Sequence, residues 1–129
     1  MLKNIVGAFA LMLFAATSAY ANHEGPYIIG EIKEIGVTPA CHEKDDMLSV
    51  LNMLPDIQAL VQQLKRLREA EKCGIFFGSP KILGQIGPDK NDNDGMPWRV
   101  VHVEYITPDN VEEQAYLLVW GTETPVLQP

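Results

Sequence analysis

Two cysteines, Cys41 and Cys73, flank a segment with a strong helical repeat, and together these features limit the folds open to the chain. Apolar residues recur there at steps of three and four, the spacing that aligns side chains along one face of a helix. The repeat consists of Met47, Val50, Leu51, Leu54, Ile57, Leu60, Val61, Leu64 and Leu67. Pro55 interrupts it, and proline is tolerated in the first turn of a helix but not in its interior. We therefore predict two amphipathic helices, over residues 43–53 and 55–71, with Gly74 as the C-terminal cap of the second.

The cysteine pair indicates a structural disulfide between Cys41 and Cys73. An even number of cysteines in a small domain is typical of proteins from an oxidising compartment. Closing a loop of about 32 residues contributes roughly 3.7 kcal/mol to stability in the chain-entropy description. Redox or metal chemistry is an alternative, although redox pairs usually stand in a Cys-x-x-Cys motif, and free thiols are a third interpretation.

The N-terminus has the three parts of a secretory signal peptide. Lys3 supplies the positive charge, and residues 5–16 form an uncharged, mostly apolar run that is shorter than the roughly 20 residues of a membrane span. Ala19-Tyr20-Ala21 matches an A-x-A cleavage site. We expect residues 1–21 to be a signal peptide cleaved after Ala21, with an uncleaved membrane anchor as the alternative. The mature protein is then periplasmic or secreted.

The mature chain is expected to be residues 22–129, folded as a single globular domain that is frayed at residues 22–26 and 122–129. The full chain carries 10 Lys and Arg against 17 Asp and Glu, a net charge of −7. This acidic balance argues against nucleic-acid binding, which needs a basic surface to neutralise phosphates. No segment after the signal peptide is long and apolar enough to span a bilayer.

Strand-like segments lie on both sides of the helical region. They cover residues 27–37, 75–77, 82–86, 98–106 and 111–120. Residues 75–77 and 82–86 are either two strands or one strand bent at Pro80. Thr38-Pro39 is expected to end the first strand, because proline restricts the residue before it. The elements predict an α+β domain in which a two-helix segment packs on a small antiparallel sheet of roughly 3–4 strands, with one disulfide.

The order of cysteine, two short helices, Cys73-Gly74 and a terminal hairpin resembles a layout in small exported bacterial proteins, in which a Cys–helix–helix–Cys segment precedes a β-hairpin. The resemblance covers roughly residues 40–120 and consists of two cysteines and a pattern of elements. It implies the disulfide and the α+β fold. It implies no activity, because none attaches to that layout.

The last two strands are expected to form a hairpin around Thr107-Pro108-Asp109-Asn110. Proline followed by aspartate favours a type I turn, and Asn110 can adopt the left-handed conformation that follows it. The three-residue loop places Val103 opposite Ala115, Val101 opposite Leu117 and Arg99 opposite Val119. We predict that the apolar face so formed, with Val101, Val103, Ala115, Leu117 and Val119, packs on the helices.

The opposite hairpin face is more aromatic than a solvated surface and more polar than a core. Its members are Trp98, Val100, His102, Glu104, Gln114, Tyr116, Leu118 and Trp120. Exposed aromatic side chains with polar neighbours often mark binding surfaces. The candidate binding face is therefore Trp98, His102, Tyr116 and Trp120, with an envelope protein or a glycan as the partner. The alternative is that residues 27–37 or 75–86 cover this face and make it a second core layer.

The polar loop over residues 87–97 contains three metal candidates, Asp89, Asp92 and Asp94, which could form a loose calcium site. The spacing does not fit an EF-hand, since its glycine and final glutamate positions are not matched. The alternative is a solvated connection rich in turn-forming residues. We assign no metal and no cofactor.

Signatures of catalysis are missing from the sequence. There is no G-x-S-x-G elbow, no H-E-x-x-H motif and no phosphate-binding glycine loop, so no catalytic residue is assigned. We expect a non-enzymatic binding or accessory module of the cell envelope. The alternative is a small hydrolase-type enzyme that uses His102 and Glu104, which share one strand face, as an acid–base pair.

Overall fold

A computed structural model describes residues 25–129 of the chain. The predicted signal peptide, residues 1–21, lies outside the described residues. The secondary structure elements, in chain order, are β1 (Tyr27–Ile28), β2 (Ile35–Cys41), α3 (Lys44–Leu51), α4 (Ile57–Glu69), β3 (Cys73–Gly78), β4 (Lys81–Asn91), β5 (Pro97–Ile106), β6 (Glu112–Trp120) and β7 (Val126–Leu127). None of the helices among these residues is long and apolar enough to cross a membrane.

The sheet is larger than predicted, and the expectation of 3–4 strands is wrong. Five strands form one antiparallel sheet in the order β3-β2-β6-β5-β4, and β1 and β7 form a separate parallel pair. The error lies in residues 75–86, which form two separate strands of the sheet, β3 and β4, instead of one strand bent at Pro80. Residues 27–37 also divide between β1, outside this sheet, and the first part of β2. The α+β class and the single disulfide are present as predicted.

Strand β2 continues through Pro39, where the sequence predicts a strand end. Pro39 lies opposite Ile75 of β3, and the pairing of Ala40 with Leu117 brings the other side of β2 against β6. Extending that register places Pro39 opposite Leu118, whose carbonyl then lacks the N–H donor that proline cannot supply. The Thr38 hydroxyl replaces it, donating to the Leu118 carbonyl oxygen at 2.8 Å. A neighbouring side chain therefore makes a proline acceptable inside the sheet.

The helical break at Pro55 is confirmed, because α3 ends at Leu51 and α4 begins at Ile57. Asp56 caps α4, its carboxylate accepting a hydrogen bond from the Ala59 N–H at 3.1 Å. The predicted cap at Gly74 is wrong. Glu71 adopts the left-handed conformation after α4 (φ 60°), and Gly74 belongs to β3.

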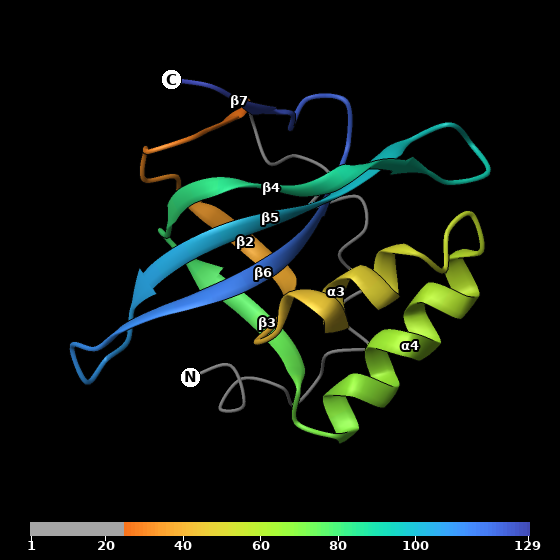
Figure 1. Ribbon diagram of the computed structural model, residues 1–129, viewed down its shortest axis with the longest axis horizontal. Helices are drawn as coiled ribbons and strands as arrows, with labels where there is room; N and C mark the ends of the chain where they lie inside the picture. The colour runs from red at the N-terminus through yellow and green to blue at the C-terminus, as the bar shows by residue number, and fades with distance from the viewer. Residues whose placement is uncertain (1–24) are drawn as a thin grey trace.

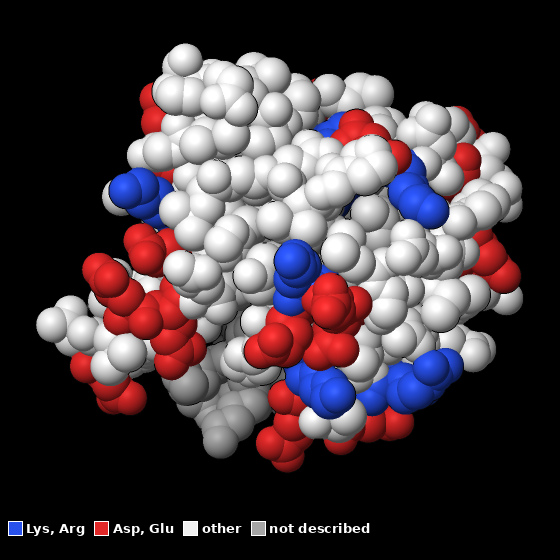
Figure 2. All heavy atoms as spheres, viewed as in Figure 1, with Lys and Arg blue, Asp and Glu red and all other residues white. Residues whose placement is uncertain are grey.

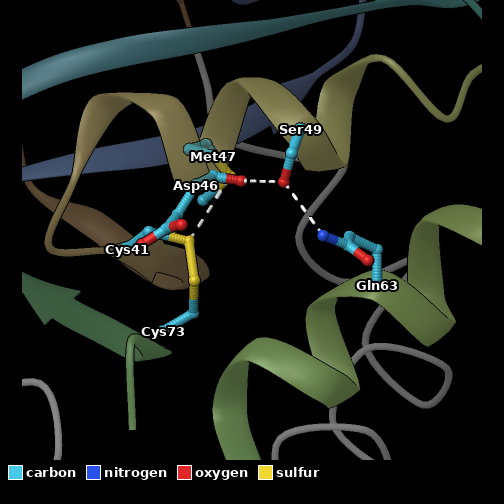
Figure 3. Close-up of a disulfide and its surroundings, with 6 residues drawn as sticks. All are labelled: Cys41, Asp46, Met47, Ser49, Gln63 and Cys73. Carbon is cyan, nitrogen blue, oxygen red and sulfur yellow. Dashed lines mark hydrogen bonds between the residues drawn. A yellow bond between two sulfur atoms is a disulfide. The ribbon is translucent and has the colours of Figure 1, made fainter. Parts of the chain in front are cut away.

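The disulfide joins Cys41 at the end of β2 to Cys73 at the start of β3, where the two residues lie directly opposite each other. The two helices are therefore an insertion closed at its base by the disulfide (Figure 3). Met47 of α3 packs its sulfur 4.0 Å from the Cys41 sulfur. Gln63 of α4 donates to the Ser49 hydroxyl of α3 at 3.0 Å, which links the two helices.

The two faces of the five-stranded sheet pack against different partners. The helices cover the face that carries Trp98, Val100, Leu118 and Trp120 (Figure 1). The opposite face, with Val101, Val103, Ala115, Leu117 and Val119, packs with Tyr27, Ile35, Phe76 and Ile82. The prediction that this apolar face packs on the helices is therefore wrong. Alternation along a strand shows which residues share a face, but it does not show which element covers them.

The C-terminal segment, expected to be frayed, is held by a buried arginine. Arg99 is only 3% exposed, and its Nη1 donates to the carbonyl oxygens of Gly121 (3.1 Å) and Thr124 (2.7 Å) and to the Thr124 hydroxyl (3.1 Å). Its Nε and Nη2 donate to the two carboxylate oxygens of Asp89, each at 2.9 Å. The Arg99 side chain on β5 therefore links β4 to the segment that leads to β7 through direct hydrogen bonds.

Candidate functional site

The β5–β6 hairpin has the predicted turn and register. Asn110 is in the left-handed region (φ 63°), and the Thr107 N–H donates to the Val111 carbonyl oxygen at 2.9 Å. The cross-strand pairs Val103–Ala115, Val101–Leu117 and Arg99–Val119 are all present. The turn chemistry was specific enough to fix which side chains share each face of the hairpin.

The two tryptophans of the predicted binding face are buried. Trp98 and Trp120 are each 7% exposed, and their rings stack with centroids 4.7 Å apart beneath the helices. The Trp98 indole N–H donates to Asp92 Oδ2 at 3.0 Å. The expectation that these side chains are partly exposed is wrong, and both belong to the core.

The remaining half of the same face extends beyond the helices, toward the hairpin turn (Figure 1). His102 and Tyr116 are partly exposed there and stack nearly parallel, with centroids 4.6 Å apart and an interplanar angle of 6°. His102 Nε2 lies 2.8 Å from Gln114 Oε1, on the adjacent strand. We call this region the open sheet face and define it by Gly84, His102, Glu104, Ile106, Gln114 and Tyr116.

Gly84 gives the open sheet face its free space. It lies opposite His102 in the β4–β5 register, so a side chain at this position would share the face with His102. A Cβ atom added at Gly84 would meet no atom within 4 Å. The surface beside the His102–Tyr116 stack can therefore accept an external group. Composition and alternation could not locate this feature, because it depends on the register of β4.

The open sheet face is bordered by acidic and apolar side chains at the hairpin turn. Figure 2 shows red carboxylates gathered at that end of the molecule. The acidic residues of the segment are Glu104, Asp109, Glu112 and Glu113, and no Lys or Arg follows Arg99 in the sequence. Ile106 is 57% exposed and Val111 is 50% exposed. The surface thus offers negative charge and aliphatic area together.

The geometry gives little support to an acid–base pair. Among residues 25–129, His102 and Glu104 share no hydrogen bond or ion pair, and His102 Nε2 is paired with the Gln114 amide oxygen. Glu104 lies opposite Lys81 and Gln114 in the registers of β5. Ser49 is part of the contact between the helices, where its hydroxyl donates to the Asp46 carbonyl oxygen at 2.6 Å. Within residues 25–129, the contacts of His102 are with Gln114 and Tyr116, and none is with a serine or cysteine.

The three metal candidates are not brought together as a ligand set. Asp89 pairs with Arg99, and Asp92 Oδ1 accepts hydrogen bonds from the backbone N–H groups of Asp94 (2.9 Å) and Met96 (3.0 Å). Within the described part of the chain, no group of three His, Cys, Asp or Glu side chains is arranged to hold a metal ion. Asp92 instead accepts hydrogen bonds from backbone groups of the polar loop, and Asp89 forms an ion pair with Arg99.

Hydrogen bonds from Arg99 hold the pKa of Asp89 below its usual range and outweigh the opposing effect of partial burial. A depressed carboxylate pKa stabilises the fold above the unfolded-state pKa of about 3.9, and that stability is lost as the pH falls through the folded-state value. We expect Asp89→Asn to lower stability at neutral pH and to flatten its fall below about pH 4. Urea unfolding across acidic pH measures this, and identical slopes for the two proteins would contradict it.

Arg99 is the structurally important residue that the sequence did not reveal. It was predicted only as the partner of Val119, in a run of otherwise apolar and aromatic residues. A lone cation in such a run is a signal for a buried ion pair, because an unpaired buried charge is unstable. Asp89 could not be chosen as its partner without knowing the β4–β5 register.

No protein-family model, curated protein or solved structure matches this chain. The function must therefore be inferred from the site itself.

Proposed function

We propose that this protein is a non-enzymatic binding module of the cell envelope that contacts a protein partner through the open sheet face. The observation that carries the proposal is the partly exposed His102–Tyr116 stack beside the free space at Gly84. This part of the sheet continues past the helices that bury Trp98 and Trp120. A surface that combines an ordered aromatic pair with unfilled space beside it is suited to binding.

The surroundings of the stack favour a protein over a glycan. Sugar rings commonly bind on the free face of an aromatic side chain, but His102 occupies one face of Tyr116 and both tryptophans are buried. The exposed aliphatic side chains of Ile106 and Val111 suit apolar protein side chains better than hydroxyl groups. Because the carboxylates of Glu104, Asp109, Glu112 and Glu113 outnumber Lys81, which lies opposite Glu104, the complementary partner carries Lys or Arg beside apolar residues.

The disulfide is consistent with an oxidising, extracellular compartment. We propose that the chain reaches that compartment by export, with residues 1–21 as its signal peptide. Mass spectrometry of the exported protein should then find Asn22 at the N-terminus. Exported protein that retains Met1 would contradict this part of the proposal.

Site-specific photocrosslinking in cells tests the proposed surface. A photoreactive amino acid at position 106 should give an adduct of one discrete mass that contains a second protein. The same amino acid at position 96, where Met96 is 38% exposed at the opposite end of β5 from Ile106, should not give that adduct. Adducts that form equally at both positions, or that are sensitive to glycosidases, would contradict the proposal.

Substitutions at Gly84 add a test of charge. Gly84→Arg introduces a bulky cation into open space, and Gly84→Glu introduces comparable bulk with the opposite charge. Neither meets neighbouring atoms at Cβ, so both should fold. We expect Gly84→Arg to reduce the adduct from position 106 at least about tenfold, and Gly84→Glu to reduce it less, because like charges across an interface cost several kcal/mol. Equal yields from the two variants would contradict a cationic partner.

A further inference from the structure

The His102 ring has one covered face and one open face. The covered face stacks on Tyr116, the residue directly opposite in the β5–β6 register. In the β4–β5 register the residue opposite His102 is Gly84, which has no side chain. Directly opposed residues on one sheet face are lateral neighbours, so the second face of the ring is turned toward the space above Gly84. The three positions form a row across β6, β5 and β4 in which the last side chain is missing.

The space above Gly84 is open, and the ring beside it has a fixed orientation. A Cβ atom at Gly84 would meet nothing within 4 Å apart from its chain neighbours. One of these, Leu83, is partly exposed and packs against neither core cluster. The His102 ring lies within 6° of parallel to Tyr116, and its Nε2 lies 2.8 Å from Gln114 Oε1. The ring therefore presents a flat, ordered surface to any group that enters this space.

The carboxylate of Glu104 favours a positively charged group in this space. Glu104 shares a sheet face with His102, two residues along β5, and lies opposite Lys81. Within residues 25–129 its carboxylate forms no ion pair, with Lys81 or with any other residue. Arginine fits this environment better than lysine, because a guanidinium is planar and stacks on aromatic rings, whereas an ammonium is a compact and strongly hydrated charge.

We propose that the open sheet face recognises an arginine side chain of its protein partner, which enters the space above Gly84. The guanidinium stacks on the free face of His102 and extends the His102–Tyr116 stack by one layer. Its N–H groups donate to the Glu104 carboxylate, and its methylene groups lie beside Leu83. This inference rests on the proposed function and narrows the cationic group of the partner to one side-chain type at one position.

NMR titration of the purified protein with the capped tripeptide Leu-Arg-Leu tests the arginine site without the natural partner. We expect saturable shifts of the Gly84 amide and His102 ring signals. The tripeptide Leu-Lys-Leu has the same charge, and it should bind at least about fivefold more weakly because an ammonium does not stack. Equal binding of the two tripeptides, or binding without shifts at Gly84 and His102, would overturn the inference.

Substitutions connect the arginine site to the partner. Glu104→Gln should weaken binding of Leu-Arg-Leu, and lower the yield of the adduct from position 106, at least about fivefold. The matched control Glu112→Gln removes an exposed carboxylate opposite Ile106 on the same face, and it should change both by less than about twofold. Gly84→Leu fills the space with an uncharged side chain and should remove the preference for arginine. Gly84 is not in the left-handed region, so this variant should fold.

The outcomes separate this inference from the proposed function. An adduct from position 106 that forms equally in the original protein, Glu104→Gln and Gly84→Leu would overturn the arginine site and leave the binding surface standing. Absence of the adduct from the original protein would contradict the proposed function, and with it the recognition of a partner arginine.

Discussion

Replacing Cys73 with alanine is expected to lower the free energy of unfolding by about 2–5 kcal/mol. The disulfide joins positions 32 residues apart, and both cysteines are buried where the helical insertion leaves and rejoins the sheet. Without it, the unfolded chain regains the freedom of that loop, and the base of the insertion loses its covalent closure. Urea or guanidinium unfolding of the oxidised protein and the variant measures the difference.

The double variant Cys41→Ala/Cys73→Ala is the control, because the single variant leaves a buried thiol at Cys41 that can form intermolecular disulfides. Both variants should lose a similar amount of stability. A loss smaller than about 1 kcal/mol in the double variant would show that the disulfide does not stabilise the fold in the expected way.

Arg99→Met should lower the free energy of unfolding by about 2–5 kcal/mol, because each buried carbonyl oxygen left without a donor costs about 1–3 kcal/mol. Methionine preserves most of the aliphatic volume but leaves Asp89 and the carbonyl oxygens of Gly121 and Thr124 without their donor. The segment that leads to β7 should also become sensitive to proteolysis, because Arg99 attaches it to β5. Denaturant unfolding and limited proteolysis measure the two effects.

Lys81→Met is the matched control for Arg99→Met, since it removes an exposed cation from the adjacent strand. It should change stability by less than about 0.5 kcal/mol. Asp89→Ala should fall between the two variants, because the Asp89 side chain is 42% exposed and Arg99 retains its bonds to the C-terminal segment. Equal stability of Arg99→Met and Lys81→Met would contradict the structural role of Arg99.

Local chemistry made the helices and the terminal hairpin predictable. Pro55 marked the break between the helices, and the Thr107–Asn110 turn fixed the pairing of Val103 with Ala115. The extent of the sheet was not predictable in this way. Pro39 was taken as a strand end, but it is accommodated in β2 because Thr38 satisfies the Leu118 carbonyl oxygen. That arrangement depends on contacts between residues far apart in the sequence.

The candidate site was predicted only in part, for a related reason. His102 and Tyr116 share a face and are partly exposed, but Trp98 and Trp120 on the same face lie beneath the helices. Both faces of the hairpin are apolar enough to be core, so alternation could not show where the helices pack. The position of Gly84 beside His102 required the register of a third strand.

Hydroxyl-radical footprinting of the protein, purified and in its native envelope, tests the central claim most directly. We predict that Trp98 and Trp120 resist labelling in both settings, while His102 and Tyr116 are labelled in the purified protein and protected in the envelope. His42, which is partly exposed near the disulfide, provides an internal reference. Labelled tryptophans would contradict the division of this face into covered and open halves. Equal labelling of His102 and Tyr116 in both settings would contradict its role as a binding surface.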